Sequence, residues 1–325
     1  MSGTSRQSFA KPLWLVFRRA LPFLTAAWPA VTASAQTLND PVRSQIEGAR
    51  LGVGYAQMIN LSATPDLSAA SYTVSGAETD LFLDVFRIPY QAHWFAISPE
   101  SDVYWRLSAG YLRMKQFVPF SDAGVDSKWS AASATGGVLA KFSLGRGFTL
   151  EPALDLGLAR LENKADYLGN AGALQPALDR LLFNWHTNAW IATPSIGVGW
   201  RHSDEGRTLS LRAHVARSWI KSFGATDSVQ DFSEAANIYS ARAEYALPSS
   251  LRVSNRSLDW IVYSGYAGFF GANKDALGFD SVGEVGIGVG WPFEQGPLQT
   301  KLRLTAGYFA GHNVKGWNVG LSFGF

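Results

Sequence analysis

The sequence predicts an all-β fold, a twelve-stranded antiparallel β-barrel that spans a membrane. Stretches in which apolar residues alternate with small or polar ones recur along most of the chain, and the last of them ends on Phe325. The first 35 residues, in addition, have the composition of a secretory signal. Successive side chains of a strand point to opposite faces, so each stretch has one apolar and one polar face. An outer-membrane barrel needs both faces, because it meets lipid outside and its own lumen inside.

The composition excludes several other classes of protein. With 47% hydrophobic and 17% charged residues, the chain does not suit a disordered protein. Cysteine is absent, which excludes disulfides, thiol catalysis and metal sites with Cys ligands. The five histidines are scattered without the spacing of a metal site, and no Gly-rich phosphate loop occurs. We therefore expect neither a metal nor another cofactor.

Residues 1–35 are typical of a secretory signal peptide. They contain four basic residues and no acidic one, and a short apolar core covers residues 20–31. The core is too short to span a membrane as a helix, and two prolines interrupt it. Residues 33–35, Ala-Ser-Ala, fit a signal-peptidase site, so we expect cleavage near Ala35.

Removal of the signal changes the charge balance. The full chain has a net charge of +2, and losing four basic residues leaves 2 − 4 = −2. This balance gives no case for nucleic-acid binding. In the mature chain, residues 36–47 are expected to form a short polar lead in the periplasm or the lumen, and residues 48–325 the barrel.

The strands follow from the alternation of apolar and polar residues. Residues 148–158 show it most clearly, with Leu154, Leu156 and Leu158 on one face and Asp155 on the other. The twelve strands are expected near residues 49–59, 81–97, 103–111, 129–142, 148–158, 190–200, 209–215, 239–245, 258–270, 285–291, 302–308 and 317–325.

The connections between these strands alternate in length. The shorter ones are expected near residues 98–102, 144–147, 202–206, 248–256 and 292–297. The longer ones are expected near 60–80, 116–128, 162–186, 222–233, 271–276 and 311–316, with a possible short helix within 173–183. Transmembrane barrels have short periplasmic turns and longer external loops, and an even strand number would place both chain ends in the periplasm.

A membrane barrel explains this pattern better than a soluble β-sandwich or a secreted barrel. Lipid offers no partner to free backbone N–H and C=O groups, so a sheet that crosses it must close on itself. The second face of the strands is small and polar, which does not suit a dry core. Aromatic residues near strand ends fit the girdles at membrane interfaces; these are Trp129, Trp190, Trp200, Trp219, Trp291 and Trp317.

Residues 50–325 resemble the translocator barrel of autotransporters. The likeness rests on the strand count, the stretch 151–157 (EPALDLG), the Gly-rich stretch Val285–Trp291 and the terminal Phe325. Because only residues 36–47 lie between the signal and the barrel, the chain looks like the solitary autotransporter-type barrel, which has no passenger. The resemblance implies a Gram-negative outer membrane and an assembly signal, read by the barrel assembly machinery, that comprises Leu321, Phe323 and Phe325.

Charged residues on the polar faces are the candidate functional residues. The lumen-lining candidates are Arg106, Lys141, Glu151, Asp155, Arg212, His214, Arg242, Glu244, Glu284 and Arg303. They could form a charged channel lining that selects solutes. They could equally form a network of ion pairs that fills a narrow lumen, which the mixed signs favour because a buried charge is costly unless paired.

The sequence predicts a narrow, porin-like pore or a structural membrane protein, monomeric among outer-membrane lipids and without enzymatic activity. A lipid hydrolase is one alternative, but His186-Thr187-Asn188 lacks the serine that a barrel phospholipase places near its histidine. His214 and Ser218 share a face of their strand but lie about 13 Å apart along it. A surface receptor or adhesin that uses the loops 60–80 and 162–186 is the other alternative.

Overall fold

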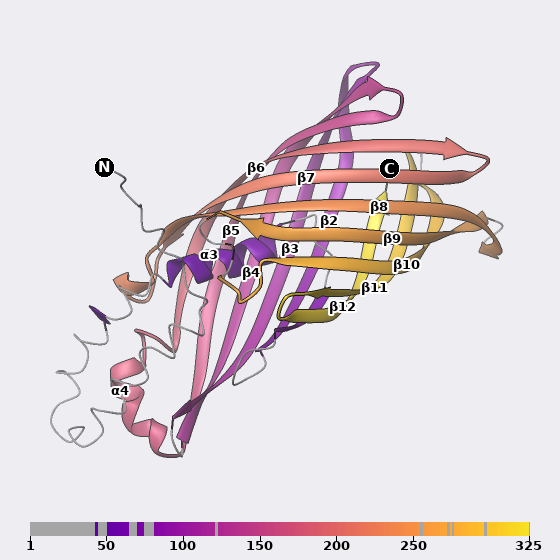
Figure 1. The fold of residues 1–325 in the computed structure, drawn as a ribbon. Coiled ribbons are helices and arrows are strands. Elements are labelled where there is room, and N and C mark those ends of the chain that lie inside the picture. The colour runs from indigo at the N-terminus through magenta and orange to yellow at the C-terminus, as the bar shows by residue number, and fades with distance from the viewer. Residues whose placement is uncertain are drawn as a thin grey trace, which may run out of the picture.

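The structure, a computed structural model, describes residues 43–44, 51–64, 70–74, 81–120, 123–253, 256–271, 274, 276–295 and 298–324. Within this part of the chain the strands form one closed antiparallel barrel, in which each strand pairs with its neighbours in the sequence and the first strand also pairs with the last (Figure 1). The predicted all-β barrel is therefore confirmed.

Eleven long strands and one short strand make up the described barrel. In chain order they are β1 Ala70–Val74, β2 Leu81–Ser98, β3 Ser101–Phe120, β4 Ala123–Gly145, β5 Phe148–Leu168, β6 Trp185–Asp204, β7 Arg207–Phe223, β8 Ser233–Val253, β9 Arg256–Phe270, β10 Ser281–Gln295, β11 Leu298–Gly311 and β12 Val314–Gly324. The helical elements are α3 Gly52–Ala63, η2 Gly169–Leu174, α4 Gln175–Leu178 and η3 Ser228–Gln230.

The two ends of the barrel differ in their connections. At one end, which we call the turn end, strands are joined through residues 99–100, 146–147, 205–206, 254–255 and 296–297. At the other, the loop end, the connections are 75–80, 121–122, 169–184, 224–232, 271–280 and 312–313. The short helix expected within 173–183 corresponds to α4.

The first predicted strand is wrong. Residues 49–59 were expected in a strand, but Gly52–Ala63 form the helix α3, and β1 lies inside the predicted loop 60–80. Nearly every residue of α3 is buried. Its own apolar residues therefore lie on all faces of the helix and do not alternate with polar ones along the sequence. A short apolar run of this kind fits a buried helix as well as a strand.

Several predicted connections are also wrong, because the strands extend further than the alternation indicates. β3 continues to Phe120 and β4 begins at Ala123, within the predicted loop 116–128, and β8 reaches Val253, within 248–256. The loop predicted at 311–316 is only 312–313. A strand that projects beyond the lipid meets water on its outer face, so the apolar alternation fades before the strand ends.

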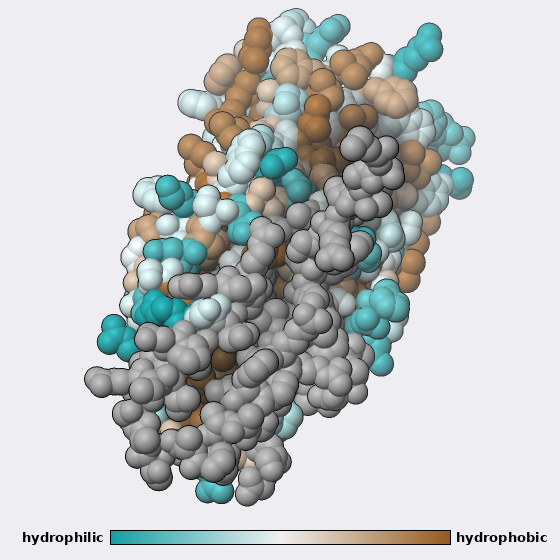
Figure 2. Space-filling model, turned by 60° about the vertical axis from the view of Figure 1, so that its left-hand side comes forward, coloured by the Kyte–Doolittle hydropathy of each residue, from teal (hydrophilic) through white to brown (hydrophobic). Residues whose placement is uncertain are grey.

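The outer wall is apolar and the inner face is not. On β5, Leu154, Leu156 and Leu158 are 50%, 58% and 46% exposed, whereas Asp155 between them is 2% exposed. The faces predicted for this strand are thus confirmed, and Figure 2 shows apolar residues gathered over the barrel wall. Trp190 and Trp219 lie on this wall, but the assignment of Trp129 to a girdle is wrong, because Trp129 is buried inside.

Two further observations concern the ends of the chain and its helices. Leu321 and Phe323 of the predicted assembly signal lie in β12, while Phe325 lies outside the described residues, as does the expected signal peptide. Among the helices that the structure describes, none is both long and apolar enough to cross a membrane.

Candidate functional site: the filled lumen

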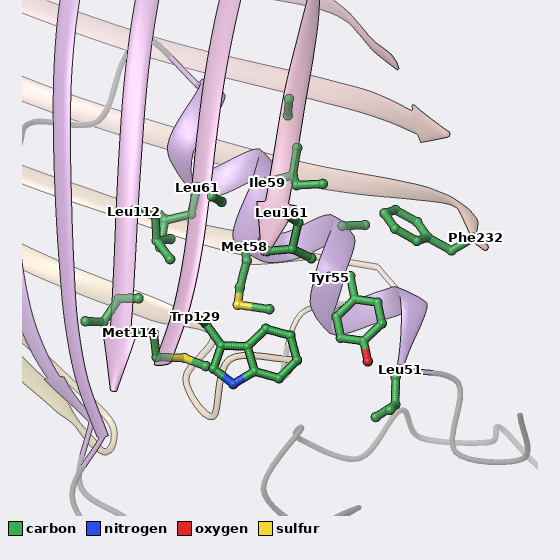
Figure 3. Close-up of a cluster of buried hydrophobic side chains, with 14 of the residues drawn as sticks. Leu51, Tyr55, Met58, Ile59, Leu61, Leu112, Met114, Trp129, Leu161 and Phe232 are labelled. Carbon is green, nitrogen blue, oxygen red and sulfur yellow. The ribbon is translucent and has the colours of Figure 1, made fainter. Parts of the chain in front are cut away.

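Helix α3 lies inside the barrel. It contacts β2, β3, β4 and β5 on one side and β7 and β8 on another, which is possible only from within the lumen (Figure 1). Its first turns lie toward the loop end, where Tyr55 packs against Trp129, Trp185 and Phe232 with ring centroids 5.6, 4.8 and 6.0 Å apart. Figure 3 shows Tyr55, Trp129 and Phe232 among the buried side chains around the helix.

The local sequence sets where α3 ends. Thr64 has an extended conformation, and its backbone N–H and its Oγ1 both donate to the carbonyl oxygen of Asn60, at 3.0 and 2.8 Å. Pro65 follows in the sequence, and a residue that precedes proline avoids the helical conformation. The last turn of α3 is therefore closed by its own side chains near the middle of the barrel.

Polar groups attach this last turn to the barrel wall. Ser218 donates to Oδ1 of Asn60 at 2.7 Å, and Ser62 donates to Ser133 at 3.1 Å. Arg87 reaches from β2 to the carbonyl oxygen of Thr64 at 2.7 Å. Because these groups are buried, losing any partner would leave a polar atom without compensation. The position of α3 is thus fixed by specific bonds as well as by apolar packing.

Gly110 of β3 gives α3 the space it occupies. A Cβ at this position would collide with the carbonyl oxygen of Ser62. Only glycine therefore lets the helix backbone approach the wall this closely.

The predicted lumen charges form ion pairs. Arg106 on β3 binds Asp155 on β5 through two nitrogens, with Nε and Oδ1 2.6 Å apart, and both side chains are at least nine-tenths buried. These two strands are not neighbours, so the pair bridges β4 across the inner face. The predicted network of paired charges is present at this site.

Glu151 is the centre of a second group, toward the turn end. One of its oxygens lies 3.0 Å from Arg212 and the other 4.0 Å from Lys141, while its own side chain is 12% exposed. A carboxylate between two cations on different strands ties these strands together.

Glu244 and Glu284 form a third group. Arg303 lies 2.7 Å and Arg242 3.7 Å from Glu244, and Arg242 also lies 3.9 Å from Glu284. The guanidinium of Arg242 sits 3.7 Å above the ring centroid of Tyr263, a cation–π contact. Nine of the ten predicted lumen residues are therefore in these three groups, and a role in passing solutes stays a prediction for all ten.

The tenth residue, His214, is buried on β7. Ser218, which the lipid-hydrolase alternative places with it, uses its hydroxyl to bind Asn60 and Thr193. His186 has Nδ1 3.4 Å from Oγ1 of Thr226. Among the described residues no group of three or more His, Asp or Glu could hold a metal ion.

The segment before α3 is tied to the loop end. Arg43 donates to both carboxylate oxygens of Asp227, in the β7–β8 connection, at 2.7 and 2.8 Å. These bonds hold the pKa of Asp227 below its ordinary value. The rest of the predicted lead 36–47, apart from Ser44, lies outside the described residues.

Sequence reasoning missed the residues that hold α3, chiefly Tyr55, Asn60, Ser62 and Arg87. The sequence does contain one indication against the predicted strand: apolar and polar residues do not alternate strictly over residues 51–63. Their partners are distant in the sequence, so the sequence alone did not associate them.

Solved structures of similar shape are autotransporter barrels. The β domain of the Bordetella autotransporter BrkA matches at 16% identity and TM-score 0.50, over 78% of this chain and 93% of that one. The NalP translocator domain of Neisseria meningitidis matches at 10% and 0.50, over 90% and 99%. The transport unit of AIDA-I from Escherichia coli matches at 11% and 0.51, over 85% and 99%. These likenesses show the fold.

The sequence itself gives the family. No curated protein matches it. Residues 78–323, however, match the solitary outer membrane autotransporter beta-barrel domain. Autotransporter barrel domains sit in the bacterial outer membrane and are generally not enzymes. Because this match covers most of the chain, the protein belongs to the family of solitary outer-membrane autotransporter β-barrels.

Proposed function

We propose that this protein is a translocator-type barrel whose lumen is closed at rest by its own helix α3. It then acts as a structural outer-membrane protein, and small solutes pass only when α3 is displaced. The observation that carries this proposal is the burial of α3 inside the barrel, with its last turn bonded to Ser133, Ser218 and Arg87.

Two different kinds of group lie inside the described part of the barrel. Toward the loop end, α3 packs against aromatic residues of the wall, including Trp129 and Trp185. Toward the turn end, the ion pairs of Glu151 and Glu244 reach across the inner face. Paired charges neutralise each other and leave only a weak electrostatic field to attract a passing ion. This supports a closed barrel over a selective channel.

The orientation follows from the connections. We infer that the loop end faces outward, because external loops of bacterial barrels are the longer ones. The contact between Arg43 and Asp227 then supports an external position for the segment before α3, in place of the periplasmic or lumenal one expected from the sequence. Cleavage near Ala35 and the lack of an enzymatic activity remain parts of the same proposal.

A disulfide between α3 and β4 tests the closure. The chain contains no cysteine, and the hydroxyls of Ser62 and Ser133 lie 3.1 Å apart, so Ser62→Cys with Ser133→Cys places two thiols within reach. In a planar bilayer, we expect the wild type to show brief, rare openings. The oxidised double variant should show none, and reduction should restore the wild-type record.

Two controls complete this test. The single variant Ser62→Cys, treated with the same oxidant, should behave as the wild type. A barrel without residues 36–63 that still migrates as a folded species should conduct steadily, whereas removing only 36–47 should leave it closed. A steady conductance through the oxidised double variant would exclude α3 as the closing element.

A further inference from the structure

Three basic side chains lie on the outer wall near the loop-end margin of its apolar part. Arg113, Arg160 and Lys221, on β3, β5 and β7, are all exposed. Each lies two residues nearer the loop end than a large exposed residue on the same face: Tyr111, Leu158 and Trp219, which are 47%, 46% and 51% exposed. Phe117 and Phe223 are also exposed and lie still nearer the loop end, so the charges lie within the margin of the apolar belt, where aromatic and basic residues meet lipid headgroups.

Two of these three cations, Arg160 and Lys221, have no acidic residue opposite them in the strand register, whereas Arg113 lies opposite the exposed Asp84. None of the three forms an ion pair or a hydrogen bond within the described residues, while other surface lysines nearby do. Lys128 lies 2.7 Å from Asp166, and Lys164 lies 3.2 Å from Glu162.

An apolar groove opens directly below two of the three. It has a volume of about 670 Å³, and its walls include Leu156, Leu158, Trp190 and Trp219, with Lys221 at its edge. Ala192 and Ala235 form its floor, since these small residues pair in register with Trp219 on either side. The groove is within the roughly 300–1,000 Å³ that small-ligand sites occupy.

The strand register brings the groove and the charges together. Leu158 pairs with Trp190, and Trp190 pairs with Lys221, so the three form one row across β5, β6 and β7. Arg160 is two residues beyond Leu158 on the same face. Arg160 and Lys221 thus flank Trp190 at the polar edge of the groove.

We propose that this groove binds a phosphate-bearing lipid with several acyl chains, of the lipid A type, with a phosphate on Arg160 and Lys221. The apolar walls suit an acyl chain, and a guanidinium and an ammonium suit phosphate oxygens. A zwitterionic lipid would bring its own amine and gain less from these charges. The placement of this lipid in the outer leaflet rests on the orientation proposed above.

Lipid binding to the full mature chain in detergent tests the site. Native mass spectrometry would give the apparent Kd for bis-phosphorylated, hexa-acylated lipid A and for phosphatidylethanolamine. The wild type should prefer lipid A. Arg160→Gln with Lys221→Gln should weaken lipid A binding by about tenfold or more, because each removes a charge-assisted hydrogen bond.

A matched variant controls for charge alone. Arg207→Gln with Arg252→Gln removes two exposed cations near the turn end and should leave the Kd unchanged. Ala192→Trp keeps every charge but fills the groove, so it too should weaken lipid A binding. All variants should migrate as folded barrels.

Three results would overturn the proposal. They are equal weakening by the two charge variants, no effect of Ala192→Trp, and no preference for lipid A over phosphatidylethanolamine. Binding in detergent depends neither on the leaflet nor on α3, so a failed closure experiment would leave this result standing, and the reverse holds as well.

Discussion

Arg106 and Asp155 show how a single charged residue is held inside this barrel. The side chain of Arg106 is 9% exposed and that of Asp155 3%, and Arg106 also lies 3.4 Å from the hydroxyl of Ser195. A Cβ on Gly137 would collide with the Asp155 carboxylate, so the neighbouring strand leaves space for this pair. Taking both charges from water is costly, and their mutual contact offsets that cost.

Asp155→Ala should therefore be strongly destabilising. It leaves the guanidinium of Arg106 buried without a counter-charge, which costs about 3–5 kcal/mol of the free energy of unfolding. Urea titration of the barrel in lipid vesicles measures this loss. Asp166→Ala breaks the exposed pair with Lys128, which water screens, and should leave the free energy of unfolding nearly unchanged. Equal losses for the two variants would contradict the role given to burial.

At the scale of the element, α3 depends on the barrel around it. It has 12 residues, and isolated helices of this length are marginal in water. Its stability must come from packing against Trp129 and Trp185 and from the bonds of Asn60 and Ser62. We therefore expect α3 to form as the barrel closes and to loosen without unfolding the strands.

Gly110→Ala should loosen α3 in this way. The added methyl group would collide with the Ser62 carbonyl oxygen. Overpacking of this kind destabilises the closed position of α3 by about 1–3 kcal/mol. We therefore expect roughly tenfold more frequent openings in a planar bilayer. Gly265→Ala is the matched control, because its Cβ would have no neighbour nearer than 3.6 Å. An unchanged opening frequency for Gly110→Ala would argue against closure by the last turn of α3.

At the scale of the whole molecule, closure rests on the short strand β1. Its five residues pair with both β2 and β12 and so join the two ends of the sheet. Without β1, residues 81–85 of β2 and 314–318 of β12 would have free edges, which lipid does not tolerate. The barrel thus closes where β1 meets β12, the last strand in the sequence.

Deleting Phe325 should lower the amount of assembled barrel in cells severalfold, while refolding of the purified chain into vesicles stays unchanged. The reason is that the terminal aromatic residue is expected to be read by the assembly machinery rather than to stabilise the fold. The heat-modifiable gel shift measures both amounts. Phe223→Ala, which removes an exposed aromatic residue of the wall, should leave assembly in cells normal. If refolding fell as well, Phe325 would be a stabilising residue.

By itself, the sequence determined the barrel, the faces of β5 and its family resemblance. These features follow from local alternation, since every strand that crosses lipid must be apolar on one side. The tertiary structure decided the rest. The helical state of residues 52–63 and the inward position of Trp129 depend on a surrounding lumen. The pairing of Arg106 with Asp155 and of Arg303 with Glu244 depends on which strands curve toward each other. The alternation of apolar and polar residues along a strand does not encode that curvature.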